Sequence, residues 1–153
     1  MEDPYDLERF AAVQGAGDTY DQVTEELRQG QKVSHWMWFI FPQIAGLGQS
    51  PTSRTYAISS LEEAKAYLSD PVLGPRLIEC AGIVARSGSR TAEMIFGAID
   101  ARKLFSSMTL FHRAAPDEPS FKQVLDVYFD GQEDEATIHL LETMPADRPR
   151  PSA

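Results

Sequence analysis

The chain has 153 residues, of which 42% are hydrophobic and 24% are charged, and this composition is typical of one folded domain. Its single cysteine excludes an internal disulfide and any zinc site that uses two or four cysteines. Its net charge of −9 argues against general nucleic-acid binding, which needs a basic surface.

Helix signals follow one another along almost the whole sequence. N-cap residues precede apolar positions spaced three and four apart, and glycine or proline ends many of the segments. No segment alternates with period two, and no internal repeat is visible. We predict helices that begin at Pro4, Asp18, Ser60, Gly74, Thr91, Asp100, Asp117 and Asp134. The predicted fold is therefore all-α: a compact single-domain multi-helical array of seven or eight short helices over residues 1–144, with residues 145–153 as a disordered tail.

Residues 34–43 break this pattern and contain both tryptophans, in the run Ser-His-Trp-Met-Trp-Phe-Ile-Phe-Pro-Gln. A run this apolar fits a buried strand, a tight helical turn or an extended crossing, and periodicity does not decide between them. The tryptophans either supply buried core area or form an aromatic wall. In the second case His35, Trp36 and Gln43 line a pocket that recognises a ring-bearing ligand.

The next loop contains Gly46 and Gly48, and Ser50-Pro51 then gives an N-cap and a first helical residue. A glycine-rich turn before a helix offers backbone N–H groups and a partial positive charge to an anion. Arg54 lies in that first turn. The alternative is an ordinary capped turn, because neither a dinucleotide fingerprint nor a phosphate loop is present.

The helix from Asp100 is apolar on most sides, which indicates burial. Lys103 and Ser107 share one stripe of it and are placed to contact one ligand together. The alternative is that such hydroxyls bond to backbone carbonyls of their own helix.

Charge is divided unevenly along the chain. Residues 1–30 and 117–153 each carry −6, whereas residues 31–116 carry +3, and no carboxylate occurs between Glu26 and Glu62. The acidic ends are either solvated helix faces or a surface that steers a basic protein partner. The centre is the part of the chain suited to an anionic ligand.

Other signals narrow the function further. His35, His112 and His139 lack the spacing of metal ligands, and Cys80 lies on an apolar helix face, so we expect neither a metal site nor a cofactor. The chain start has no basic segment followed by an apolar stretch, and no apolar run approaches the roughly 20 residues of a membrane helix. We therefore expect a cytoplasmic protein that does not bind membranes.

Several segments resemble the bacterial family of domain of unknown function 1810. They are DPYDLERF at 3–10, SHWMWFIFPQIAGLG at 34–48, YAISSLEEAKAYLSDPVLGPRL at 56–77, IFG at 95–97, KLFSSMTLF at 103–111 and VLDVYFDG at 124–131. The resemblance implies a compact multi-helical domain and no established activity. This chain departs from the family at Ala101, where a second acid usually follows Asp100.

Members are often labelled calpastatin, an inhibitor of calpain. We reject that label because such inhibitors are long and disordered, whereas this chain has dense caps and enough apolar residues for a core.

A second resemblance is to the NAD- and ADP-ribose-associated glycosidase superfamily. The chain has an early aromatic motif at 36–39, a central alanine-containing helix at 61–68 and a late Met…Phe helix at 108–111 in the same order. That superfamily relies on a Glu-His pair in the early motif, whereas this chain has Ser34-His35 with no carboxylate nearby in the sequence. The resemblance implies a nucleotide-like ligand rather than the reaction.

These observations lead to two hypotheses. The first is a domain that binds an anionic, ring-bearing small molecule, a nucleotide or an ADP-ribose-like compound, with or without turnover. Its site is built from His35, Trp36, Trp38, Gln43, Arg54, Lys103 and Ser107. The alternative is a helical protein-interaction module that uses its acidic terminal helices.

Overall fold

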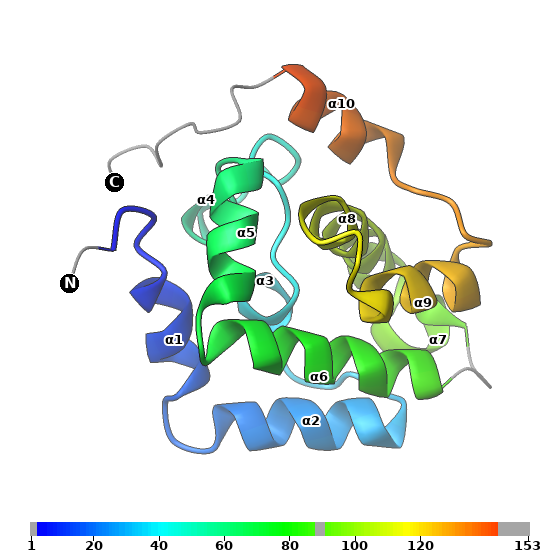
Figure 1. The fold of residues 1–153 in the computed structure, drawn as a ribbon. Helices are drawn as coiled ribbons and strands as arrows, with labels where there is room; N and C mark the ends of the chain where they lie inside the picture. The colour runs from blue at the N-terminus through cyan, green and yellow to red at the C-terminus, as the bar shows by residue number, and fades with distance from the viewer. Residues whose placement is uncertain (1–2, 88–90, 144–153) are drawn as a thin grey trace.

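The computed structural model describes residues 3–87 and 91–143. Over these residues the chain forms ten helices and no β-strand (Figure 1), which confirms the all-α prediction. The helices are α1 (Glu8–Gln14), α2 (Thr19–Gln29), α3 (Met37–Ile40), α4 (Pro51–Thr55), α5 (Leu61–Ser69), α6 (Leu73–Arg86), α7 (Ala92–Phe96), α8 (Ala98–Ala114), α9 (Pro119–Tyr128) and α10 (Glu135–Thr143). None of these helices combines the length and the apolar character that a bilayer crossing requires.

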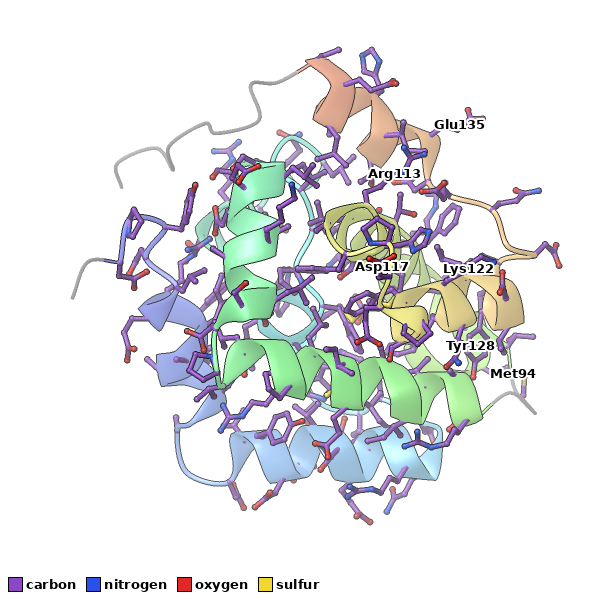
Figure 2. The ribbon with its side chains drawn as sticks, viewed as in Figure 1. Met94, Arg113, Asp117, Lys122, Tyr128 and Glu135 are labelled. Atoms are coloured by element: carbon purple, nitrogen blue, oxygen red, sulfur yellow. The ribbon has the colours of Figure 1, made fainter. Side chains whose placement is uncertain are left out.

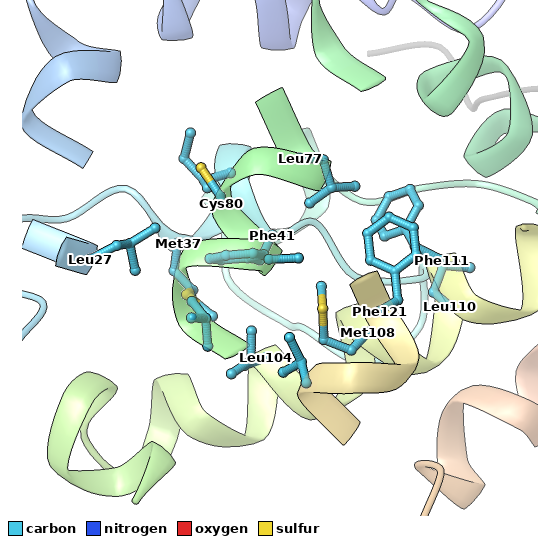
Figure 3. Close-up of a cluster of buried hydrophobic side chains, with 14 of the residues drawn as sticks. Leu27, Met37, Phe41, Leu77, Cys80, Leu104, Met108, Leu110, Phe111 and Phe121 are labelled. Carbon is cyan, nitrogen blue, oxygen red and sulfur yellow. The ribbon is translucent and has the colours of Figure 1, made fainter. Parts of the chain in front are cut away.

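Helix α8 is the centre of the arrangement, because it packs against α5, α7, α9 and α10. Helix α6 lies between α2 and α9 (Figure 1). Figure 3 shows how α8 meets the aromatic segment: Leu104 and Met108 face Met37 and Phe41, and all four side chains are almost inaccessible to solvent. One hydrophobic core therefore joins the aromatic segment to the longest helix.

Several predicted caps are confirmed at the level of single hydrogen bonds. The Ser60 hydroxyl accepts from the Glu63 amide at 3.1 Å, and the Thr91 hydroxyl accepts from the Met94 amide at 3.1 Å. Gly30 ends α2 in the left-handed conformation, with φ of 74°. These ends depend on local chemistry, which is why sequence signals located them.

The predicted helix from Pro4 is wrong in its start. The Asp3 carboxylate accepts from the amides of Leu7 and Glu8, at 2.8 and 3.0 Å, and so closes a turn. Asp6 has φ of 52°, which interrupts a helix, and α1 begins only at Glu8.

Two later starts are also shifted. Helix α8 begins at Ala98 with Asp100 inside its first turn, and α9 begins at Pro119 with Glu118 as its cap. In both cases the cap is a residue other than the expected aspartate: Gly97 precedes α8, and Glu118 precedes α9. Met144 and the predicted tail at 145–153 lie outside the described residues.

The predicted number of helices was too low because two short ones lie around the aromatic motif. Helix α3 is a tight helical turn, which is one of the three conformations that fit the apolar run at 34–43. Helix α4 begins at the expected proline after Ser50. Ile44, which lies between α3 and α4, forms an isolated parallel bridge with Ile58, which follows α4. Ile58 donates to the Gln43 carbonyl and accepts from the Ala45 amide, both at 2.8 Å, and these bonds join the two ends of the loop that carries α4.

Candidate functional site

The loop before α3 is built around the buried carboxylate of Glu26, a residue of α2 that is only 3% exposed. Its Oε1 accepts from the amides of Val33 and Ser34 at 2.7 and 2.9 Å, and from the Trp36 indole N–H at 2.9 Å. Its Oε2 accepts from the Ser34 hydroxyl at 2.6 Å and from the Gln22 amide at 2.8 Å. One carboxylate thus fixes the path of the chain into the aromatic motif.

Burial of Glu26 opposes its ionisation, but the hydrogen bonds from Ser34, Gln22 and Val33 outweigh that effect and lower its pKa to about 2. Glu26 is therefore an ionised structural group at neutral pH. Its partner Trp36 is 2% exposed and packs edge-on against Phe96, with ring centroids 6.4 Å apart. The structure places Trp36 in the core.

Trp38 has a different environment, because it is the half-buried residue of α3 and lines two cavities. The first, which we call the hollow, has a volume of about 430 Å³ and is lined by Lys32, His35, Trp38, Phe96, the α8 N-cap Gly97 and residues 98–100 of α8. The second, which we call the crevice, has a volume of about 10 Å³, about the size of one water molecule. Its lining includes Trp38, Gln43, Ser53, Tyr56 and Lys103.

Two lysines share one carboxylate at the edge of the hollow. The Lys32 ammonium lies 2.9 Å from Asp100 Oδ2, and the Lys103 ammonium lies 3.5 Å from Asp100 Oδ1. Lys103 Nζ also lies 4.9 Å from the centre of the Trp38 ring, close enough for a cation–π contact. Two positive charges and one negative charge leave the cluster with a net positive charge beside an aromatic ring.

The first turn of α8 adds to this positive potential. Its residues line the hollow, and no described side chain caps its amides. Uncapped N–H groups at the start of a 17-residue helix favour a nearby anion.

Two buried polar atoms in this region have no hydrogen-bond partner among the described residues. They are Trp38 Nε1 and Ser107 Oγ, the latter on a side chain with no solvent exposure. Ser107 lies one turn after Lys103 on α8. Unpaired buried donors cost free energy, which a water molecule or a ligand group recovers by accepting from them.

The fold brings together some of the predicted site residues and separates others. Trp38, Gln43 and Lys103 line the crevice, and His35 joins Trp38 in the hollow. Arg54 is exposed on α4 and lines neither cavity, and Trp36 and Ser107 are buried.

The sequence did not indicate Lys32 or Asp100 as site residues. In the sequence Asp100 has the position of a helix start, and Lys32 stands alone after a helix end, with no motif around it. Lys32 is held in place by a backbone bond from its amide to the Ile95 carbonyl, at 2.7 Å. Only such a contact between distant segments reveals its position.

The fold also supplies carboxylates that the sequence placed far from His35. Glu26 binds the adjacent Ser34, and Asp100 lines the same hollow as His35. Ala101, the residue after Asp100, is 2% exposed. Asp100 is the acidic residue in the lining of the hollow, among the described residues.

Metal binding and thiol chemistry receive no support from the described residues. No three of their His, Cys, Asp and Glu side chains gather as metal ligands do. Burial raises the pKa of the Cys80 thiol to about 12, so it is not an activated nucleophile.

The geometry defines the class of protein: a compact all-α domain with a surface hollow that is lined by aromatic and basic side chains. The chain belongs to the family described as protein of unknown function (DUF1810), whose model matches residues 4–141, so the resemblance drawn from its motifs is confirmed. It is similar to the conserved hypothetical protein Rv1873 from Mycobacterium tuberculosis, known from a crystal structure, with 51% identity and a TM-score of 0.89. The match covers 93% of this chain and 100% of the other. No curated protein matches the chain.

Proposed function

We propose that the protein binds an anionic, ring-bearing small molecule, such as a nucleotide or an ADP-ribose derivative, in the hollow beside Trp38. The observation that carries the proposal is the cluster of Lys32, Lys103 and Asp100 against the Trp38 ring. The hollow is an open depression of the surface, and its volume of about 430 Å³ is within the roughly 300–1,000 Å³ of small-molecule sites.

Each part of such a ligand has a suitable neighbour. The ring stacks on the exposed part of Trp38, in the way that aromatic side chains bind flat groups. The anionic part faces Lys32, His35 and the first turn of α8. Neither a metal nor a further cofactor takes part in the proposed binding, and we place the protein in the cytoplasm.

Calorimetric titration with ADP-ribose, ADP and adenosine tests the proposal. We expect ADP-ribose and ADP to bind the wild type, and Trp38→Ala and Lys103→Ala each to weaken binding at least tenfold. Lys122→Ala is the matched control, because Lys122 also pairs with an aspartate, Asp126, at 3.0 Å, but on the exposed face of α9 (Figure 2). The proposal is refuted if no nucleotide binds, or if the double variant of Trp38 and Lys103 binds like the wild type.

The interaction-module hypothesis gains no specific support, because several of its acids are engaged within the fold. Glu26 is buried, and Glu133 forms a two-bond pair with Arg113 at 2.6 and 3.0 Å. Asp134 accepts from the Thr137 hydroxyl at 2.6 Å at the start of α10. Of these three acids, Glu133 has its charge offset by a cation, and Glu26 and Asp134 accept from neutral groups of the fold.

A further inference from the structure

Resting on the proposed function, we infer that Asp100 is an internal counter-ion that a ligand phosphate displaces. In the free protein its carboxylate pairs with Lys32 and Lys103, and a phosphate group of a nucleoside diphosphate takes its place when the ligand binds. Asp100 is thereby a specificity-determining residue of the hollow.

The exposures of the three side chains support exchange at this position. The Lys32 side chain is only 8% exposed, whereas those of Asp100 and Lys103 are 20% exposed. The Lys32 ammonium also donates to the Ser34 carbonyl at 2.7 Å, but a neutral carbonyl does not balance its charge, so we infer that Lys32 keeps a negative partner in both states. Asp100 lines the hollow and is the more accessible member of the Lys32 pair, so it is the group that can move aside.

The two lysines around Asp100 offer more positive charge than one carboxylate neutralises, so a phosphate is a suitable replacement for it. One carboxylate divides its two oxygens between two lysines at 2.9 and 3.5 Å, so the second contact is long. A phosphate has more acceptor oxygens and more charge, and the first residues of α8, whose amides have no side-chain cap, line the same hollow.

The requirement for a ring comes from Trp38. Its indole N–H is buried without a partner among the described residues, and its ring borders both the hollow and the crevice. Lys103 lies against this ring, so the phosphate position and the stacking surface adjoin each other. A nucleoside diphosphate combines the two groups, and neither pyrophosphate nor adenosine does.

The counter-ion role makes a prediction of unusual sign, because removing a site residue strengthens binding. Asp100→Asn preserves the shape but removes a negative charge that the phosphate must displace and then lie beside. We expect the variant to bind ADP about tenfold more tightly than the wild type, and adenosine with unchanged affinity. Asp126→Asn on α9 is the matched control, because Asp126 also pairs with a lysine, and we expect it to leave both affinities unchanged.

The decisive experiment is calorimetry of ADP, pyrophosphate and adenosine with the wild type, Asp100→Asn and Asp126→Asn. If ADP binds the wild type but Asp100→Asn binds it equally or more weakly, the counter-ion role is refuted and the proposed function stands. If ADP binds neither protein, the proposed function itself fails. Competition on the wild type needs no variant: we expect pyrophosphate to displace ADP, and failure to compete overturns the phosphate position.

Discussion

Glu26→Gln is a sharp test of how the aromatic motif is positioned, because it keeps the side-chain shape, removes the charge and replaces one of the two accepting oxygens with an amide donor. In the folded protein the pKa of Glu26 is about 2, against an ordinary value of 4.5. This difference corresponds to about 3 kcal/mol of stability when the carboxylate is ionised. We expect the variant to lose about 3 kcal/mol in its free energy of unfolding at neutral pH.

The lowered pKa of Glu26 also fixes the direction in which this stability difference changes with pH. Because folding lowers the pKa of Glu26, its contribution is fully present above pH 4.5 and is lost as the pH falls towards 2. The wild type should therefore lose its advantage over Glu26→Gln across this window, while groups common to both proteins cancel in the difference.

Urea unfolding followed by circular dichroism at a series of pH values measures the difference. Glu25→Gln is the control, because Glu25 is an exposed neighbour whose carboxylate accepts from the Gln29 amide of the same helix, at 2.9 Å. We expect that control to change stability by less than about 0.5 kcal/mol. A stability difference for Glu26→Gln that does not vary with pH would refute the assignment of the effect to charge.

Three further predictions concern stability and reactivity. Glu63→Ala leaves buried Arg9 without its carboxylate at 2.8 Å, and should lower the free energy of unfolding by about 3 kcal/mol in urea; a loss below about 1 kcal/mol contradicts this. Cys80 should resist a thiol reagent in the folded protein at about pH 8 and react at once in denaturant, so rapid labelling of the folded state counts against its burial. Gly74→Ala places a methyl group 2.1 Å from a backbone carbonyl oxygen and should lower the free energy of unfolding by at least about 2 kcal/mol. Gly82→Ala is the control, because its methyl group meets only the end of a flexible side chain, and it should not have this effect. Equal melting temperatures for the two variants would refute the clash.

The features that the sequence predicted correctly are those governed by neighbouring residues. Ser60 and Thr91 cap their helices because a hydroxyl reaches an amide three residues on. The two tryptophans show the limit of such signals. They are two residues apart at a single helical turn, so they face nearly opposite directions. Which of them faces the core depends on Glu26 of α2 and on Lys103 of α8, and no local pattern contains that information.

The missing acids in the centre of the chain explain why the hollow is positive. Lys32 lies in the segment between Glu26 and Glu62 that has no carboxylate, and Glu26 itself is occupied by the amides and indole of the loop. The partner of Lys32 therefore comes from α8, where Asp100 already pairs with Lys103. A local acid would give each lysine its own partner and cancel the charge of the cluster. Its absence leaves two ammonium groups with one carboxylate beside Trp38, and this imbalance is the chemical basis for expecting an anion there.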